Sequence, residues 1–195
     1  MWLVYSQKTN RDLMLGSDRH LVHWITFLET NPDVRTFELE PVDGLSSPGA
    51  AVTEKGVDAA VELRDGQLEY HLLILSGRRK SPHSPDNVHA DKRVRVFTEV
   101  DLFPRGEEAM RWLHLVGYCA GIRDEEQQEA TLACIATLRG LRRGTLSQVL
   151  ESLTDFDPQV TIGVFSRLAV RGDIAVDLSS SAFTLASQWA WRGEE

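Results

Sequence analysis

The sequence has few cysteines and none of the short motifs that mark several large enzyme classes. Its two cysteines, Cys119 and Cys134, form no C-x-x-C pair. We therefore expect no disulfide scaffold, but two buried free thiols in a reducing, cytoplasmic setting. The sequence also has no P-loop, no dinucleotide-binding fingerprint and no G-x-S-x-G element, so it offers no support for the enzyme classes that depend on them.

Long hydrophobic runs are missing as well. The longest run of large aliphatic residues is Leu72–Leu75, which is far too short to span a bilayer. The first residues, Met1 to Lys8, contain no apolar segment of the kind that a secretory signal requires. We therefore expect no membrane partner.

The chain is not basic overall, since its formal net charge is −8, and the total charge gives no support for nucleic-acid binding. One stretch between residues 78 and 95 is locally basic. Such a stretch contacts phosphate in some proteins and is a solvated loop in others, so DNA binding there is one of two interpretations. Its basic residues are Arg78, Arg79, Lys80, Lys92, Arg93 and Arg95.

The first half of the chain predicts an α/β arrangement. Apolar residues recur at helical spacing up to Thr30, with Ser17 or Asp18 as the cap, and Asn31-Pro32 ends the helix. Residues Val34–Leu39 alternate as a strand. Val57–Leu75 predicts a hairpin with a two-residue turn at Asp65-Gly66.

The second half predicts mostly helix. We expect helices over Gly106–Ile122 and Glu125–Leu138, a third from Thr145 and a fourth opened by Asp157-Pro158. A strand over 173–178 and a short one near 182–185 follow. Two helices followed by a β-ribbon are typical of a winged helix. We therefore expect the chain to have three segments: a core over 1–105, a helical connection over 106–143 and a winged-helix domain over 144–195.

Several short motifs occur in an order that resembles one family, the TnsA-type endonucleases of heteromeric transposons. The resemblance implies a restriction-endonuclease-like α/β core with a mixed sheet, followed by a winged helix. The order of the elements is more specific than any single motif. The matching stretches are Phe27–Val34, Gly56–Ala59, Asp65-Gly66, Thr98-Glu99, Glu107–Tyr118 and Gly172–Leu178.

The family's nuclease chemistry requires paired carboxylates around Mg²⁺ and a nearby lysine. The helix glutamate of the family falls near His20 or Leu21, and neither is a carboxylate. With a two-residue turn, Asp58 faces Leu73, and residues 73–76 provide no acid and no base. The pattern therefore predicts a degenerate nuclease.

One arrangement keeps a catalytic centre, because Glu69-Tyr70-His71 has the order acid-x-base. In the predicted register Asp58, Glu69 and His71 share one face, and Asp58 is the candidate Mg²⁺ ligand. Glu69 then lies roughly 13 Å along the strand from Asp58, and His71 roughly 7 Å. A β-bulge would change these spacings. The other interpretation is an ordinary polar hairpin face.

The predicted winged helix has two interpretations. Its helix around Thr161–Val170 would expose Thr161, Ser166, Arg167 and Arg171 to DNA, but only two of these are basic. Winged helices also dock proteins, and in the resembled family the C-terminal unit contacts the ATPase regulator of transposition.

Three functions stay open at this stage. The first is a TnsA-like, catalytically degenerate subunit of a DNA-transposition or mobile-element complex. This subunit would bind a recombinase, transposase or ATPase partner protein, and DNA is a further candidate partner. The second is an active Mg²⁺-dependent DNA endonuclease that cuts transposon ends with Asp58. The third is a winged-helix DNA-binding regulator.

Overall fold

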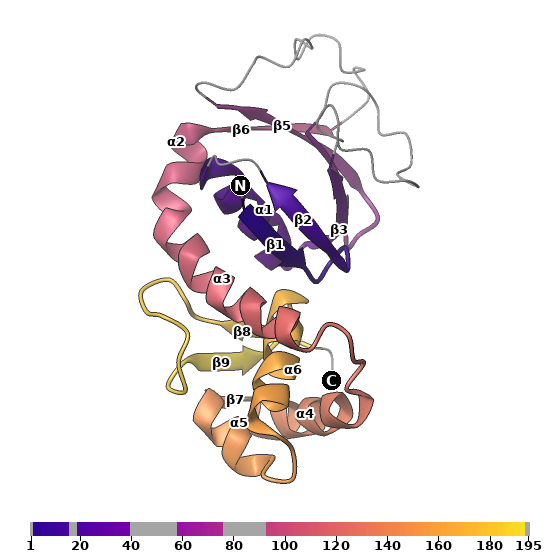
Figure 1. The fold of residues 1–195 in the computed structure, drawn as a ribbon, viewed down its shortest axis with the longest axis vertical. Coiled ribbons are helices and arrows are strands. Elements are labelled where there is room, and N and C mark those ends of the chain that lie inside the picture. The colour runs from indigo at the N-terminus through magenta and orange to yellow at the C-terminus, as the bar shows by residue number, and fades with distance from the viewer. Residues whose placement is uncertain (1, 16–18, 40–57, 76–92, 194–195) are drawn as a thin grey trace. The chain divides into compact units, whose positions relative to one another are not determined.

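A computed structural model describes residues 2–15, 19–39, 58–75 and 93–193 (Figure 1). The fold is mixed α/β, as predicted. Its contacts define two units, which we call the terminal unit (Met1–Pro32 with Arg105–Glu195) and the sheet unit (Asp33–Pro104). This grouping differs from the division expected at residues 105 and 143, because the first 32 residues pack with the C-terminal half of the chain.

The sheet unit contains a four-stranded mixed sheet. Its strands are β3 (Val34–Leu39), β4 (Ala59–Leu63), β5 (Leu68–Ile74) and β6 (Arg93–Thr98), in that order. The first three strands are antiparallel, whereas β6 runs parallel to β5. The short helix α2 (Glu99–Leu102) follows β6 directly, and the side chain of Asp101 caps its first turn by accepting from Thr98.

The turn between β4 and β5 differs from the prediction. It is a three-residue loop, Arg64–Gly66, in which Gly66 has a φ of +83° and both Gly66 and Leu63 are held by backbone hydrogen bonds. This geometry is typical of a type I turn with a glycine bulge. Ala59 therefore pairs with His71, and Val61 with Glu69. The expected pairing was wrong by one residue. Each side chain of β4 therefore shares a face with the β5 side chains that were expected on the other face.

The terminal unit begins with a hairpin that the sequence analysis did not predict, β1 (Trp2–Ser6) and β2 (Arg11–Leu15). The helix α1 (Arg19–Thr30) follows, with its predicted end. After the 3₁₀ turn η2 (Phe103–Arg105), the chain returns with α3 (Gly106–Gly121) and α4 (Gln128–Leu141). None of the helices in the described ranges has both the length and the apolar character needed to traverse a bilayer.

The rest of the terminal unit follows local signals closely. It consists of β7 (Arg143–Thr145), α5 (Leu146–Ser152), α6 (Pro158–Val170), β8 (Ile174–Val176) and β9 (Gln188–Trp191). Thr145 and Gln148 form a capping box at α5, and Asp157 caps α6, so both predicted helix starts are confirmed. The last strand lies at 188–191 instead of near 182–185, and β9 occupies the centre of the sheet β7-β9-β8.

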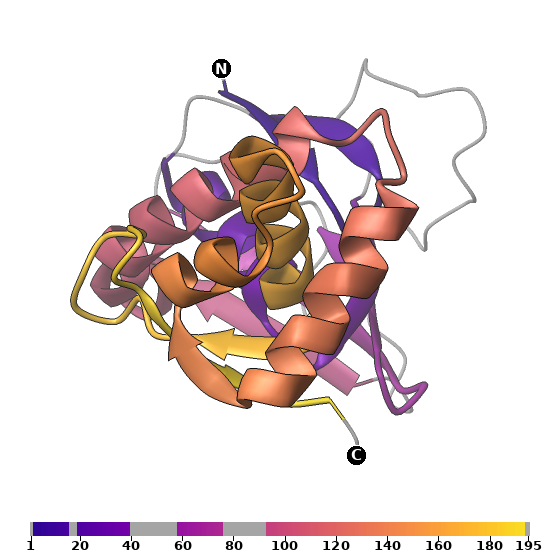
Figure 2. The same cartoon turned by 90° about the horizontal axis from the view of Figure 1, so that it is seen from below.

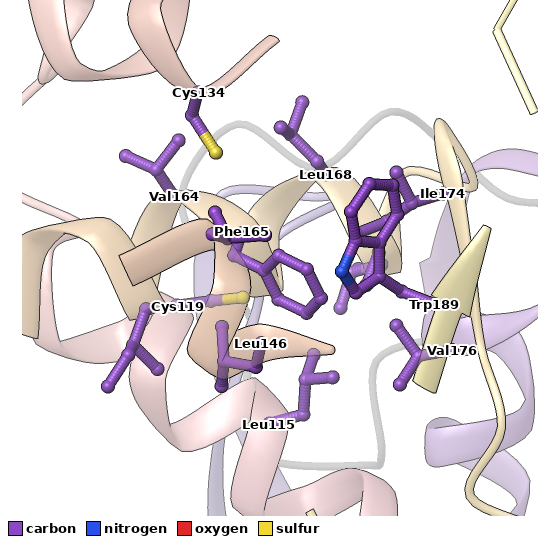
Figure 3. Close-up of a cluster of buried hydrophobic side chains, with 14 of the residues drawn as sticks. Leu115, Cys119, Cys134, Leu146, Val164, Phe165, Leu168, Ile174, Val176 and Trp189 are labelled. Carbon is purple, nitrogen blue, oxygen red and sulfur yellow. The ribbon is translucent and has the colours of Figure 1, made fainter. Parts of the chain in front are cut away.

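The core of the terminal unit surrounds α6. Phe165 of α6 is fully buried, and Leu115, Leu146 and Trp189 surround it from three other elements (Figure 3). The helix packs against α1, α3, α4 and α5. Gly163 permits a close approach to Ile122, which follows α3, since a Cβ atom at Gly163 would lie 2.8 Å from the Ile122 side chain.

Both cysteines lie in this core as free thiols, as predicted. Cys119 comes from α3 and Cys134 from α4 (Figure 3). Burial raises the pKa of each thiol to about 12. The thiols therefore stay protonated at neutral pH and act as packing groups rather than nucleophiles.

A buried carboxylate in α1 anchors the N-terminal hairpin. Glu29 accepts hydrogen bonds from Ser6 Oγ (2.7 Å) and from the backbone N–H groups of Gln7 (2.6 Å) and Lys8 (3.1 Å). The Lys8 ammonium donates in turn to the carbonyls of Leu28 and Asn31 near the end of α1. Burial raises the pKa of Glu29, although these hydrogen bonds and Lys8 oppose the shift.

We expect Glu29→Ala to lower the free energy of unfolding by about 3 kcal/mol, because it leaves the buried Ser6 hydroxyl and the partly buried N–H groups of Gln7 and Lys8 without their acceptor. Urea denaturation of the full chain measures this loss. Glu107→Ala, at an exposed position of α3, is the matched control and should change stability by less than about 0.5 kcal/mol. Equal effects of the two substitutions would contradict the anchoring role.

Candidate functional site

Asp58 lies immediately before β4 and stabilises the end of β5. Its backbone N–H donates to the carbonyl of His71 at 2.8 Å. Its side-chain Oδ2 accepts from the backbone N–H of Leu73 at 2.6 Å. The carboxylate therefore closes the hairpin ladder by a charge-assisted hydrogen bond.

Glu69 and His71 are two buried residues of β5. Their partners Val61 and Ala59 are fully buried, and Glu69 and His71 are themselves only 4% and 1% exposed. Asp58 precedes β4, and both its N–H and its carboxylate are directed to the backbone of β5. The structure thus brings the side chains of Glu69 and His71 together, whereas the carboxylate of Asp58 binds the backbone of Leu73.

The parallel strand β6 completes a charged group around this pair. Arg93 lies opposite Glu69 and Arg95 opposite His71. Arg93 Nε contacts Glu69 Oε1 at 2.8 Å, and His71 Nε2 lies 3.3 Å from Glu69 Oε2. We name this group, together with Phe97, the Glu69 cluster. Both carboxylate oxygens of Glu69 are used within it.

His71 is held in its neutral form. Burial is the largest cause that lowers its pKa; Arg95 lowers it further, while Glu69 opposes the shift. The ring of His71 packs against Phe97 with 4.9 Å between centroids, and the Arg95 guanidinium lies 4.9 Å from the Phe97 centroid. Since a carboxylate paired with Arg93 only accepts, Nε2 of His71 carries the proton that it shares with Glu69.

These residues do not fit a Mg²⁺ site. Mg²⁺ requires several oxygen ligands in octahedral geometry. Asp58 directs Oδ2 to the backbone N–H of Leu73, and Glu69 directs its two oxygens to Arg93 and His71. Within the described ranges, no group of three or more His, Cys, Asp or Glu residues is placed to hold a metal. As they are described, Asp58, Glu69 and His71 therefore do not form a Mg²⁺ site.

The predicted DNA-reading helix is a core helix. Thr161 and Ser166 of α6 are 2% and 0% exposed, so the expectation that they face solvent was wrong. Arg167 donates to the carbonyls of Ile122 (3.0 Å), Glu126 (3.2 Å) and Glu125 (3.5 Å), which follow the end of α3. Arg171, after the helix, is exposed and lies 3.5 Å from Asp173.

The basic stretch of residues 78–95 is described only in part. Arg78, Arg79, Lys80 and Lys92 lie outside the described residues. Arg93 and Arg95 belong to the Glu69 cluster, where Arg93 pairs with a carboxylate. The sequence analysis identified Glu69 and His71 by their acid-x-base order. It missed their arginine partners because the parallel pairing of β5 with β6 joins residues more than twenty positions apart.

Comparisons with protein-family models, with curated proteins and with solved structures found no match for this chain. The likeness to TnsA-type proteins therefore depends on the sequence motifs and on the order of the elements.

The neutral state of His71 predicts a stability that depends on pH. Its pKa in the folded chain is lower than the ordinary value of 6.5, so unfolding takes up a proton below that pH. The stabilisation is present above pH 6.5 and is lost as the pH falls through the folded pKa, with a slope of up to about 1.4 kcal/mol per pH unit.

Urea denaturation of the wild-type chain between neutral and mildly acidic pH measures this slope. His71→Gln should flatten it, because glutamine does not titrate. His114→Gln, at an exposed position of α3, is the matched control and should leave the slope as it is. An unchanged slope in the His71 variant would contradict the assignment.

Proposed function

We propose that this chain is a TnsA-like, catalytically degenerate nuclease-fold subunit that acts in a DNA-transposition or mobile-element complex by binding other components. The observation that carries the proposal is that the two candidate carboxylates are bound by different protein groups. Asp58 accepts from the backbone N–H of Leu73, and Glu69 contacts Arg93 and His71. A nuclease of this type needs the two carboxylates on one metal.

The order of elements in the chain supports the nuclease-like part of the proposal. A helix, α1, precedes the strands in the sequence, and three antiparallel strands are followed by a parallel one. Asp58 lies immediately before the second of these strands, and the resemblance implies an aspartate at this point.

The C-terminal elements support a winged-helix architecture. Their order is α4, β7, α5, α6, β8 and β9, and the sheet order is β7-β9-β8. In winged helices that bind DNA, the second helix of the helix-turn-helix enters the major groove. Here α6 holds that place in the order, and it is buried on nearly its whole surface. This burial favours a protein contact over groove reading for the winged-helix segment, and the resemblance indicates a recombinase or an ATPase regulator as the partner.

We expect neither the wild-type chain nor Asp58→Ala to nick duplex DNA in Mg²⁺ or Mn²⁺, alone or with a recombinase encoded beside it. The reason is that Glu62, the carboxylate of β4, lies four residues after Asp58 in the chain and pairs with Arg35 at 2.8 Å. Conversion of supercoiled plasmid to open circles measures nicking, with an active restriction enzyme as the assay control. Nicking that disappears in Asp58→Ala would establish the active-endonuclease alternative.

The same variant tests the structural role of Asp58. Asp58→Ala should lower the free energy of unfolding by about 1–2 kcal/mol, since the N–H of Leu73 loses a charged acceptor. Asp65→Ala, which removes an exposed hydrogen bond to Gln67 in the turn, should cost less. Co-purification of the full chain with the neighbouring recombinase or ATPase then tests assembly, and failure to associate with either would overturn the proposed role.

A further inference from the structure

A pocket lies between α3 and the loop that joins β8 to β9, and the function proposed above assigns it no role. This loop, residues 177–187, runs alongside α3 (Figure 1, Figure 2). The pocket has a volume of about 390 Å³ and is open to solvent. It is lined by His114, Gly117 and Tyr118 of α3 and by Phe183 of the loop.

Hydrogen bonds hold the loop to its neighbours near both of its ends. The Arg111 guanidinium of α3 donates to the carbonyls of Leu178 (2.8 Å) and Ser179 (2.7 Å). Near the other end, the backbone N–H of Ser147 in α5 donates to the carbonyl of Leu185 at 2.9 Å. The loop wall of the pocket is therefore preformed, as is usual for ligand sites.

Two aromatic rings form the walls of the pocket. Phe183 is half-buried and stacks on Phe165 of the core, with 6.2 Å between the ring centroids. Its ring centroid lies 5.8 Å from that of Tyr118, at an interplanar angle of 68°. Tyr118 is 37% exposed. One ring is thus fixed by the core, while the other presents aromatic surface to solvent.

Gly117 leaves the backbone of α3 uncovered at the floor of the pocket. It lies in the interior of the helix, where glycine is destabilising relative to alanine. A Cβ atom there would meet no heavy atom within 4 Å, so packing among the described residues does not require glycine. Glycine is typical of positions where a ligand approaches the backbone closely. Its place between His114 and Tyr118 therefore favours a ligand that contacts the helix itself.

We propose that this pocket binds a proline-rich segment of a partner protein in the polyproline II conformation. Such segments dock in grooves lined by aromatic side chains. Their backbone makes no internal hydrogen bonds, so their carbonyls can accept from the imidazole of His114 and the hydroxyl of Tyr118. A stiff segment loses little conformational freedom on binding, and this suits an open pocket of small area.

The charge of the pocket matches such a segment. The described residues that line it carry no carboxylate, ammonium or guanidinium group. Arg111, beside the loop, directs its guanidinium to backbone carbonyls. A nucleic acid would need cationic groups for its phosphates, and a charged peptide group would lose water there without gaining a counter-charge. An uncharged proline-rich segment avoids both costs.

This inference does not depend on the chain being related to a nuclease. The two rings, the glycine and the loop define the pocket whether or not Asp58 once held a metal. A positive result in the nicking assay would leave the inference in place, and its own failure would leave the proposed subunit role in place.

The test is titration of the isotope-labelled full chain with a synthetic decaproline peptide, which adopts polyproline II, followed by heteronuclear NMR of the backbone N–H groups. The wild-type chain should show saturable shifts at His114, Gly117 and Tyr118 and at Phe183. A peptide of the same length with alternating glycine and serine is the control ligand and should leave these signals unchanged.

Gly117→Ala separates binding from folding. Alanine favours the helix, so the variant should raise the thermal midpoint. Its methyl group occupies the floor of the pocket and should raise the Kd for decaproline by about tenfold or more. Gly140→Ala, at an exposed glycine of α4 whose Cβ would also meet no heavy atom within 4 Å, is the matched control and should leave the Kd unchanged. Tyr118→Ala should weaken binding as well.

Four outcomes would overturn the proposal. The first is the absence of saturable shifts with decaproline, and the second is wild-type affinity in both Gly117→Ala and Tyr118→Ala. The third is a response of the same N–H groups to oligothymidine but not to decaproline, which would indicate a nucleic acid as the ligand. The fourth is a concentration-dependent dimer that Tyr118→Ala abolishes and decaproline does not affect, which would indicate a second copy of the chain.

Discussion

The pairing of β4 with β5 determines which side chains of the sheet unit can meet. The three-residue loop ending at Gly66 sets Ala59 against His71, and a side chain can change face only if the whole ladder moves by one residue. This register buries Glu69, and a buried carboxylate requires compensation. Arg93 and His71 provide it. Asp58 binds the backbone N–H of Leu73, so the contacts that stabilise the sheet compete with a metal shared by the two carboxylates.

A comparable constraint governs the terminal unit, where α6 must be buried because four helices and the three-stranded sheet converge on it. Its composition fits this position. Gly163 and Ala169 permit close approach, and Phe165 fills the centre of the core. A helix enclosed in this way has no face left for a DNA groove.

The sequence correctly predicted the helices and strands whose formation depends on residues close together in the chain. The alternation of Val34–Leu39, the capping box at Thr145 and the Asp157-Pro158 helix start all depend on residues a few positions apart. The register of the β4–β5 hairpin could not be predicted from neighbouring residues. Asp65-Gly66 suits both a two-residue and a three-residue loop, because each loop needs a positive φ at the glycine. The β1–β2 hairpin was missed because its strands are five residues long and their anchor, Glu29, lies in the following helix. Arg93 could not be assigned to Glu69 without knowing that β6 runs parallel to β5.

The arginines show why charge counted along a sequence does not locate a binding surface. Arg93 and Arg167 belong to segments that predicted DNA contact, yet one pairs with a buried carboxylate and the other donates to three backbone carbonyls. A guanidinium used in this way contributes to folding and has little remaining capacity for phosphate. Whether an arginine stabilises the fold thus depends on contacts between segments that are distant in the sequence, such as β5 with β6 for Arg93 and α6 with the end of α3 for Arg167.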